Sequence, residues 1–491
     1  MYKSKNIGKL LGIALLLLIL ALPSPGGLSP EAQKLAAVTA LMVVWWITEA
    51  IPIYATAFVP VALFPLLGIM DSRSTCINYG HDYVLMLLGA FILAKAIERQ
   101  QLHRRIALNI ISLLGQKKRN IILGFMIATA FLSMWITNMA VVLIMLPIAT
   151  ALIDDKEDHD VRFGLALLLG IAYSASIGGT GTLIGTPPNL VFAGLFEQLY
   201  PRAPKIGFLD WMGIAVPLVL LFLPLIWMYL IYYFRIRKEA GLGGYAIKGQ
   251  LHDLAKMDKG ERRTLIIFIA TAIGWIFRND IALGGIMIPG WSQLLGIAEL
   301  AHDSTVALLA AILLFLTGDG KGKKLMDWKT AEKIPWGVAM FLGGGLALGA
   351  GFKSTGLAEW LGNSLTVFGT LPIFLMIALT VGILIFVTEV NSNTATATIF
   401  LPILASLCVG MAINPLLLLV PATFACSFAF MLPSGTGTNT VIFASGRLKV
   451  SDMAKAGFWL NMLCIVLLPL LLYFIIFPLV GLDAKLPAWA I

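Results

Sequence analysis

The chain has 491 residues, of which 59% are hydrophobic and 12% are charged, and its mean hydropathy is +0.90. This composition excludes a soluble globular protein, because so much apolar surface must face lipid or other buried helices. The net charge of +9 is accompanied by no nucleic-acid-binding motif, which argues against a nucleic-acid partner. We therefore predict an all-α polytopic membrane protein in a lipid bilayer.

Basic residues predict the orientation of the chain, because Lys and Arg in short loops mark the cytoplasmic side of a membrane. Counting apolar segments from the N-terminus places every major basic cluster on one side, with about 11 transmembrane helices, a cytoplasmic N-terminus and an external C-terminus. The expected crossings are residues 7–22, 35–51, 55–69, 83–97, 163–195, 211–233, 264–277, 304–317, 336–351, 414–444 and 458–479. Residues 102–114 and 353–365 are expected to form helices along the membrane surface.

Two further apolar segments each contain a polar step. Thr137-Asn138 lies in the middle of residues 121–153, and Ser392-Asn393-Thr394 lies within residues 371–407. An unpaired polar group at membrane depth costs several kcal/mol, so these side chains must be buried in protein or line a water-filled cavity. A re-entrant hairpin places such a step at its tip, and we predict one hairpin from each segment.

Two of the expected crossings contain helix-breaking residues. Six glycines and prolines lie between Gly178 and Asn189, and a similar run extends from Pro433 to Asn439. Gly and Pro at this density are too costly for a continuous helix. Each crossing is therefore predicted to consist of two half-helices.

These features recur along the chain. Gly89 is matched by Gly343 at an offset of 254, Asn138 by Asn393 at 255, and Gly179-Thr180-Gly181-Thr182 by Gly435-Thr436-Gly437-Thr438 at 256. The first hairpin opens from the inside and the second from the outside. The two halves are thus predicted to be inverted repeats, as in many secondary transporters.

Hairpin tips and half-helix ends bring unpaired backbone groups to the membrane midplane. N–H groups with hydroxyl or amide donors suit a carboxylate, and C=O groups with hydroxyl oxygens suit a hard cation such as sodium. Neither tip carries a histidine or a basic residue, so a bound anion would be held by dipoles, neutral donors and cations. Isolated polar residues such as Ser176 and Thr396 are instead expected to form helix–helix hydrogen bonds.

Several motifs resemble those of the divalent anion/sodium symporter family, and the likeness extends over essentially the whole chain. The motifs are Ser392-Asn393-Thr394 followed by Ala-Thr-Ala, the Gly-Thr-Pro-Pro-Asn run ending at Asn189, the Trp-Ile-Thr-Glu-Ala-Ile-Pro run ending at Pro52, and the two hairpins. The resemblance implies a homodimer that carries succinate, malate, fumarate, 2-oxoglutarate or citrate-like anions by an elevator mechanism. It also implies a bacterial inner membrane, no enzymatic activity, and no cofactor other than sodium ions.

The resemblance further implies a division of the chain and a set of site residues. The scaffold would comprise residues 1–115 and 237–368, the latter with a cytoplasmic linker, and the transport domain residues 116–236 and 369–491. Substrate would contact Thr137, Asn138, Met139, Thr186, Pro187, Ser392, Asn393, Thr394, Thr436 and Thr438. One sodium would bind at Ser133, Thr137, Asn138 and backbone near Gly179, and another at Thr388, Ser392, Asn393 and backbone near Gly435.

The chain departs from the family pattern at two places. Met139 replaces the threonine of the usual Ser-Asn-Thr tip, and Thr436-Gly437-Thr438-Asn439 stands where Thr-Pro-Pro-Asn is usual. These departures favour exchange of one dicarboxylate for another, with sodium-coupled symport as the alternative.

Two other functional classes remain open from the sequence. Thr317-Gly318-Asp319-Gly320 is similar to an aspartyl protease motif but has no clear partner acid, and no His-Glu-x-x-His sequence occurs. An intramembrane enzyme is therefore a weaker alternative. A channel would be distinguished by currents far above the turnover of a carrier and by the absence of counterflow.

Overall fold

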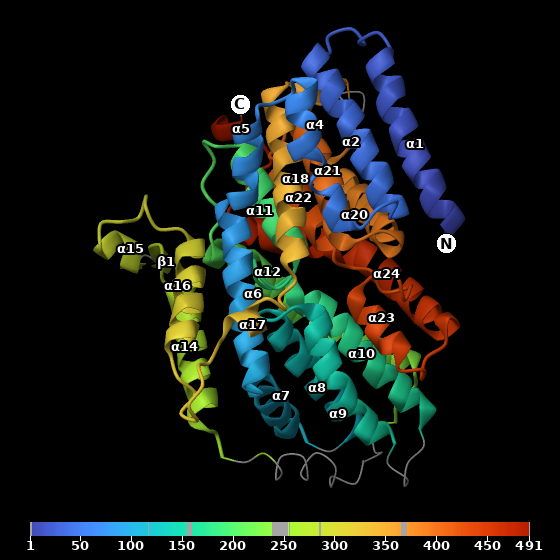
Figure 1. Cartoon of the computed structure of the whole chain (residues 1–491). Helices are drawn as coiled ribbons and strands as arrows, with labels where there is room; N and C mark the ends of the chain where they lie inside the picture. Colours follow the sequence, from blue (N-terminus) through green and yellow to red (C-terminus); the bar gives the residue numbers. More distant parts are fainter. Residues whose placement is uncertain are drawn as a thin grey trace.

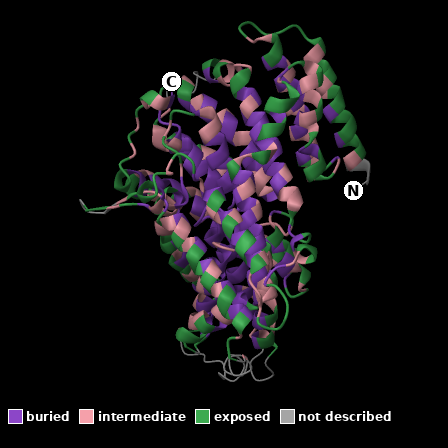
Figure 2. Ribbon diagram, turned by 60° about the vertical axis from the view of Figure 1, so that its left-hand side comes forward, coloured by how far each residue is buried: buried purple, intermediate pink, exposed green. Residues whose placement is uncertain are grey.

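The computed structural model describes residues 2–115, 117–154, 160–237, 254, 256–283, 286–364 and 371–490. Within them the regular secondary structure is helical apart from one pair of antiparallel strands, which confirms the predicted fold class (Figure 1). The described part of the chain holds six helices that are long and apolar enough to cross a membrane, and four shorter apolar ones. Figure 2 shows buried residues gathered along the middle of the molecule.

The predicted first scaffold segment contains α1 (Tyr2–Ala21), α2 (Pro30–Thr48), α3 (Ile53–Thr56), α4 (Val59–Leu67), α5 (Ser72–Cys76), α6 (Asp82–Arg99) and α7 (Leu102–Leu113). The second contains α14 (Lys259–Ile276), β1 (Ile281–Leu283), β2 (Ile286–Ile288), α15 (Trp291–Leu294), α16 (Asp303–Leu316), α17 (Trp328–Ala331), α18 (Trp336–Ser354) and α19 (Leu357–Ser364). The remaining helices are α8 (Lys118–Ser133), α9 (Asn138–Ile153), α10 (Val161–Gly179), α11 (Pro187–Leu199), α12 (Phe208–Tyr233), α20 (Ile373–Val390), α21 (Asn393–Gly410), α22 (Leu416–Ala425), α23 (Gly437–Ala444), α24 (Val450–Leu471) and α25 (Phe477–Leu479).

Each polar step separates two consecutive helices, as predicted. The residues that directly precede α9 and α21 have nearly the same extended backbone. The angles are φ −55° and ψ 136° at Thr137, and φ −60° and ψ 134° at Ser392. Asn138 and Asn393 are therefore the first helical residues of α9 and α21. Figure 1 shows α8 and α9 toward the lower end of the view and α20 and α21 in its upper half.

Both predicted broken crossings are interrupted. The first consists of α10 and α11 and the second of α22 and α23, each separated by a non-helical segment. Pro187 and Pro188 begin α11, where a missing N–H removes no intrahelical hydrogen bond. The Gly- and Pro-rich runs thus end one helix and start the next.

Packing between these elements is reciprocal. Helix α8 packs on α10 of its own half, and α20 packs on α22 in the same way. The helices that follow the two tips each pack on the other half of the chain: α9 packs on α23, and α21 packs on α11. The helix after each tip therefore contacts the half-helix that follows the break in the other half.

A smaller apolar core lies apart from this assembly. It joins Leu35 of α2 and Phe64 of α4 to Phe341 and Leu348 of α18. These residues belong to the two segments assigned to the scaffold, although a few contacts reach Ala395 of α21. Such grouping is compatible with the predicted division of the chain, which stays a prediction.

One local expectation needs correction, and one further element was not anticipated. The crossing expected at residues 55–69 is divided between α3 and α4, because Pro60 stands at the start of α4 and cannot donate the N–H that a continuous helix needs. The segment after α14 contains a β-hairpin, in which Ile281 pairs with Ile288. A Gly284-Gly285 pair in the sequence, a usual hairpin signal, separates the strands.

Gly178 tests the packing of α10 on α8. A methyl group there would overlap the Ala130 carbonyl and Cα, which are backbone atoms that cannot turn aside. We expect Gly178→Ala to lower the free energy of unfolding by about 1–3 kcal/mol. Gly213→Ala in α12 is the control, because no atom lies within 4 Å of its added methyl group. Thermal unfolding of the purified protein in detergent would measure both, and equal melting temperatures would contradict this packing.

Candidate functional site

Oxygen atoms gather around Asn138 at the first tip. When its amide nitrogen faces them, Asn138 donates to the carbonyls of Ala175 and Gly185, each at 3.2 Å, and to Ser133 Oγ at 2.8 Å. Turning the amide over places Oδ1 among these acceptors instead, where Ser133 Oγ donates to it. Four oxygens would then face one another, an arrangement that suits a hard cation.

Asn189 closes the first break. Its Nδ2 lies 3.3, 3.2 and 2.7 Å from the carbonyl oxygens of Gly179, Thr180 and Thr182. Thr182 Oγ1 in turn donates to the Met134 carbonyl beside the first tip. Carbonyls left without partners by the end of α10 are thus bonded inside the protein, as apolar surroundings require.

The second tip repeats the arrangement of the first. Thr388 Oγ1 lies 2.8 Å from Asn393 Oδ1, as Ser133 Oγ does from Asn138 Oδ1. The same hydroxyl lies 2.8 Å from the carbonyl oxygen of Cys426, just after α22 ends. Ser427 Oγ is buried nearby in the chain and has no partner among the described residues. Hydroxyl, amide and carbonyl oxygens therefore meet at this tip too.

The second break shows which residues of the two halves correspond. Asn439 Nδ2 donates to the carbonyls of Ala429 and Leu432, as Asn189 does at the first break. Asn439 lies 250 positions after Asn189, and Thr436, the N-cap of α23, lies 250 positions after Thr186, the N-cap of α11. The offset of 256 predicted from the two Gly-Thr-Gly-Thr runs is wrong for this segment, and Gly435 corresponds to Gly185 rather than to Gly179.

The two halves touch between the first tip and the second break. A Cβ at Gly437 would lie 3.2 Å from Met139 Sδ. Ser176 Oγ of α10 lies 3.3 Å from Thr438 Oγ1 of α23, which is the helix–helix hydrogen bond expected of Ser176. The side chain of Met139 is 49% exposed at this junction. The N-terminal ends of α9 and α23 therefore meet beside an accessible tip.

Not all of the predicted site residues are linked by contacts. The structure joins Asn138 with Ser133 and places it against Gly179, and it joins Thr388 with Asn393. Thr436 and Thr438 bond to each other. Thr186 and Pro187 cap α11, and the side chains of Thr137, Ser392 and Thr394 are half-buried. Their roles in substrate binding stay predictions.

Sequence reasoning assigned no role to Glu389 and missed Asn461. Glu389 ends α20 next to the second tip, and Asn461 Nδ2 of α24 donates to its Oε1 at 2.8 Å. A lone asparagine within the apolar α24 was the available signal, because buried amides in membrane helices usually have a partner. The partner itself, 72 residues away, could not be read from the sequence.

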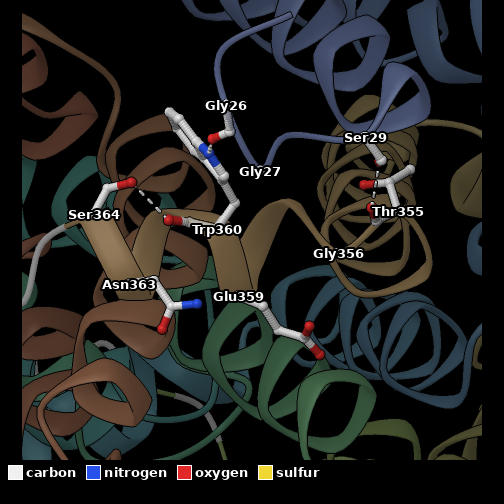
Figure 3. A pocket seen from close by; sticks show the side chains of 9 residues that line it. All are labelled: Gly26, Gly27, Ser29, Thr355, Gly356, Glu359, Trp360, Asn363 and Ser364. Carbon is white, nitrogen blue, oxygen red and sulfur yellow. Dashed lines mark hydrogen bonds between the residues drawn. The ribbon is translucent and has the colours of Figure 1, made fainter.

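Two cavities lie away from the second tip. One of about 480 Å³ is lined by the α1–α2 turn and by α19, where Trp360 Nε1 donates to the Gly26 carbonyl and Glu359 is the charged residue (Figure 3). An acidic side chain does not favour an anion there. The other, of about 710 Å³, follows α9 from Ala140 to Ile148 and is also lined by Lys95, Glu98, Gln101, His103 and Arg104. This second cavity begins two residues after Asn138.

Features that suggested an enzyme have structural roles. Asp319 lies in the loop after α16, where its carboxylate accepts hydrogen bonds from the amides of Lys321 and Lys323. Hydrogen bonds from these amides lower the pKa of Asp319 below its ordinary value. Among the described residues, no group of three His, Cys, Asp or Glu side chains could hold a metal ion.

Paired helices that stop within the apolar core, where side chains bond their terminal backbone groups, define a multi-pass membrane transporter. Over residues 3–480 the chain matches the sodium:sulfate symporter transmembrane region, and it belongs to this family. The resemblance to the divalent anion/sodium symporters is thereby confirmed.

Similar proteins agree with this membership. Sodium-dependent dicarboxylate transporters named SdcS are 41% identical in Staphylococcus saprophyticus, over 99% of this chain and 95% of that protein, and 41% identical in Staphylococcus aureus strain bovine RF122 / ET3-1, over 98% and 93%. Two solved structures share the fold. MtrF of Neisseria gonorrhoeae has a TM-score of 0.60 at 12% identity, over 99% of this chain and 97% of that one. YdaH of Alcanivorax borkumensis has a TM-score of 0.52 at 14% identity, over 89% and 98%.

Asn189 tests the closure of the first break. Removing its amide leaves three buried carbonyls without their shared donor, although Thr180 also accepts from Trp211 Nε1. We expect Asn189→Ala to lower the free energy of unfolding by about 1–3 kcal/mol. Asn439→Ala should lower it by less, because Asn439 bonds two carbonyls rather than three. Asn109→Ala on the exposed face of α7 is the control. A melting temperature of Asn189→Ala equal to that of Asn109→Ala would contradict this role.

Proposed function

We propose that the chain is a secondary active transporter that carries dicarboxylates with sodium across a bacterial inner membrane. The observation that carries this proposal is the pair of corresponding tip and break units, each with hydroxyl, amide and carbonyl oxygens around an asparagine at the start of a helix. Relatives named as sodium-dependent dicarboxylate transporters support the ion and the substrate class.

The first oxygen set supports cation binding at the first tip. Ser133 Oγ and the carbonyls of Ala175 and Gly185 surround one end of the Asn138 amide. In the absence of a cation, the amide N–H group satisfies these acceptors. When sodium binds, rotation of the amide would supply Oδ1 as a further ligand, so one asparagine could serve both states.

The second oxygen set supports a second cation. It combines Thr388 Oγ1, Asn393 Oδ1 and the Cys426 carbonyl. Ser427 Oγ, which has no partner among the described residues, is adjacent in the chain. In each half one carbonyl comes from the C-terminal end of a helix, which carries the negative end of the helix dipole: Ala175 lies near the end of α10, and Cys426 directly follows α22. Both sets therefore match the chemistry of sodium rather than that of a softer metal.

Anion binding is supported by the N-terminal ends of two helices. The N-termini of α9 and α23 meet where Met139 lies against Gly437, and Ser176 and Thr438 provide hydroxyls there. Helix N-termini favour negative charge and carry unpaired N–H groups. Bound sodium would offset the charge of the carboxylates, so each ligand would favour binding of the other.

Symport is the form of coupling that we propose. Met139 and the altered second break favour exchange, but Thr137, Asn138 and the backbone oxygens of the first set remain available to a cation. The names of the relatives favour sodium dependence. Tricarboxylates such as citrate stay a secondary substrate class.

We also propose that the protein is a homodimer with an elevator mechanism, inverted halves, a cytoplasmic N-terminus and an external C-terminus. The reciprocal packing of α9 on α23 and α21 on α11 supports the repeat. The separate core of α2, α4 and α18 supports a scaffold that remains fixed while the tips and breaks move together.

Uptake by proteoliposomes tests the coupling. We expect an inward sodium gradient to drive labelled succinate uptake into vesicles without internal dicarboxylate, and replacement of sodium by choline to abolish it. Flux that needs internal dicarboxylate but not sodium would instead establish exchange. If no dicarboxylate moved in either mode, the proposed substrate class would be wrong.

Variants of the two tip asparagines test the site. We expect Asn138→Ala and Asn393→Ala each to reduce succinate uptake by about tenfold or more at subsaturating substrate, because a hydrogen bond to a charged group contributes about 1.5–3 kcal/mol. Asn109→Ala should transport normally. Size-exclusion profiles and melting temperatures would verify folding, and full uptake by either tip variant would refute the role of that residue.

A further inference from the structure

We propose that Glu389 makes the two cation sites unequal, by giving the second site a fixed negative charge that the first site lacks. This inference rests on the proposed sodium-coupled function and adds a residue that controls cation affinity. Glu389 ends α20 and directly follows Thr388, whose hydroxyl belongs to the second oxygen set. Its side chain is not part of the oxygen set itself.

Among the residues that the structure describes, only neutral donors form hydrogen bonds to the Glu389 carboxylate. Its Oε1 accepts from the amides of Phe430 at 2.7 Å and Met431 at 2.8 Å and from Asn461 Nδ2 at 2.8 Å. Its Oε2 accepts from the Leu432 amide at 3.0 Å. Four donors match the needs of an ionised carboxylate, which can only accept hydrogen bonds.

No ion pair offsets this charge within the part of the chain that the structure describes. Residue Glu389 is 3% exposed and Asn461 is fully buried. A buried charge without a counter-charge is costly, even when hydrogen bonds surround it. A cation that binds nearby would therefore be attracted to this buried carboxylate more strongly than to a carboxylate in contact with water.

The second cation site is the place where such a cation would bind. The segment bonded by Glu389, residues 430–432, lies between the Cys426 carbonyl and Gly435. A Cβ at Gly435 would lie 3.0 Å from Glu389 Oε2 and 3.3 Å from its backbone oxygen. Thus the carboxylate lies between the second tip and the backbone of the second break.

The first half closes its break without a charge. Met134 lies 255 positions before Glu389, the offset that relates Asn138 to Asn393. The Met134 carbonyl accepts from Thr182 Oγ1, so a neutral hydroxyl joins tip to break there. Two halves with matching asparagines thus differ at this position by one buried negative charge.

The expected consequence is a difference in sodium affinity, with the second site the tighter. Sodium-dependent stabilisation of the purified protein measures it without transport, because a ligand that binds the folded state raises the melting temperature. Sodium would be varied against choline at constant ionic strength and fixed pH, without dicarboxylate. We expect Glu389→Gln, which retains the shape of the side chain, to raise the sodium concentration for half-maximal stabilisation by about tenfold or more.

Asn461→Ala is the matched control, because it removes one donor to Glu389 but keeps the charge. Its sodium midpoint should stay within about threefold of the wild-type value, because the negative charge that attracts the cation is still present. An unchanged midpoint in Glu389→Gln would overturn the proposal. A melting temperature lowered equally at every sodium concentration would also overturn it, because that is the result of a purely structural role.

A second variant keeps the test decisive if Glu389→Gln does not fold. Asn461→Lys places an ammonium group beside the carboxylate and should weaken sodium binding without changing Glu389. A wild-type midpoint in this variant would contradict the inference. Failure of the proposed function looks different: the wild-type protein itself would then show neither sodium-dependent uptake nor sodium-dependent stabilisation.

Discussion

The structure depends on satisfying backbone groups where helices end inside an apolar core. At the ends of α10 and α22 several carbonyl and amide groups have no partner in their own helix, and water is not available to replace one. Asn189, Asn439 and Glu389 supply the missing partners from other segments. The breaks can persist only because these side chains are in place, so the site and its stability have the same origin.

Reciprocal packing places the two sets of broken ends together. Since α9 rests on α23 and α21 rests on α11, neither tip can shift without displacing the half-helix after the opposite break. A rigid unit of this kind suits the proposed elevator mechanism, in which the ligands move with their binding site. It also explains how sodium at one tip could influence an anion held between the halves, because both ligands bind parts of the same packed unit.

The sequence predicted the interruptions well because polar or helix-breaking residues in apolar segments have few structural solutions. Asn138 and Asn393 were identified as equivalent, and both begin a helix after an extended residue. The alignment of the breaks failed because Gly-Thr-Gly-Thr similarity carries no information about which carbonyl is satisfied by which amide. The bonds of Asn189 and Asn439 decide that correspondence, and they are visible only in three dimensions. The same is true of the pair Glu389 and Asn461, which come from different helices.

The charge of Glu389 affects how the proposed binding site could move through a membrane. In the proposed mechanism, one sodium in each oxygen set and a divalent carboxylate cancel one another. The loaded site then has the same net charge as the empty site, which is that of Glu389 alone. A charge held by backbone amides and Asn461 moves together with its own donors, so its solvation does not have to be rebuilt at each end of the movement. A partly loaded site, with the anion but without sodium, would carry a larger uncompensated charge and meet a higher barrier, which is a physical basis for coupling.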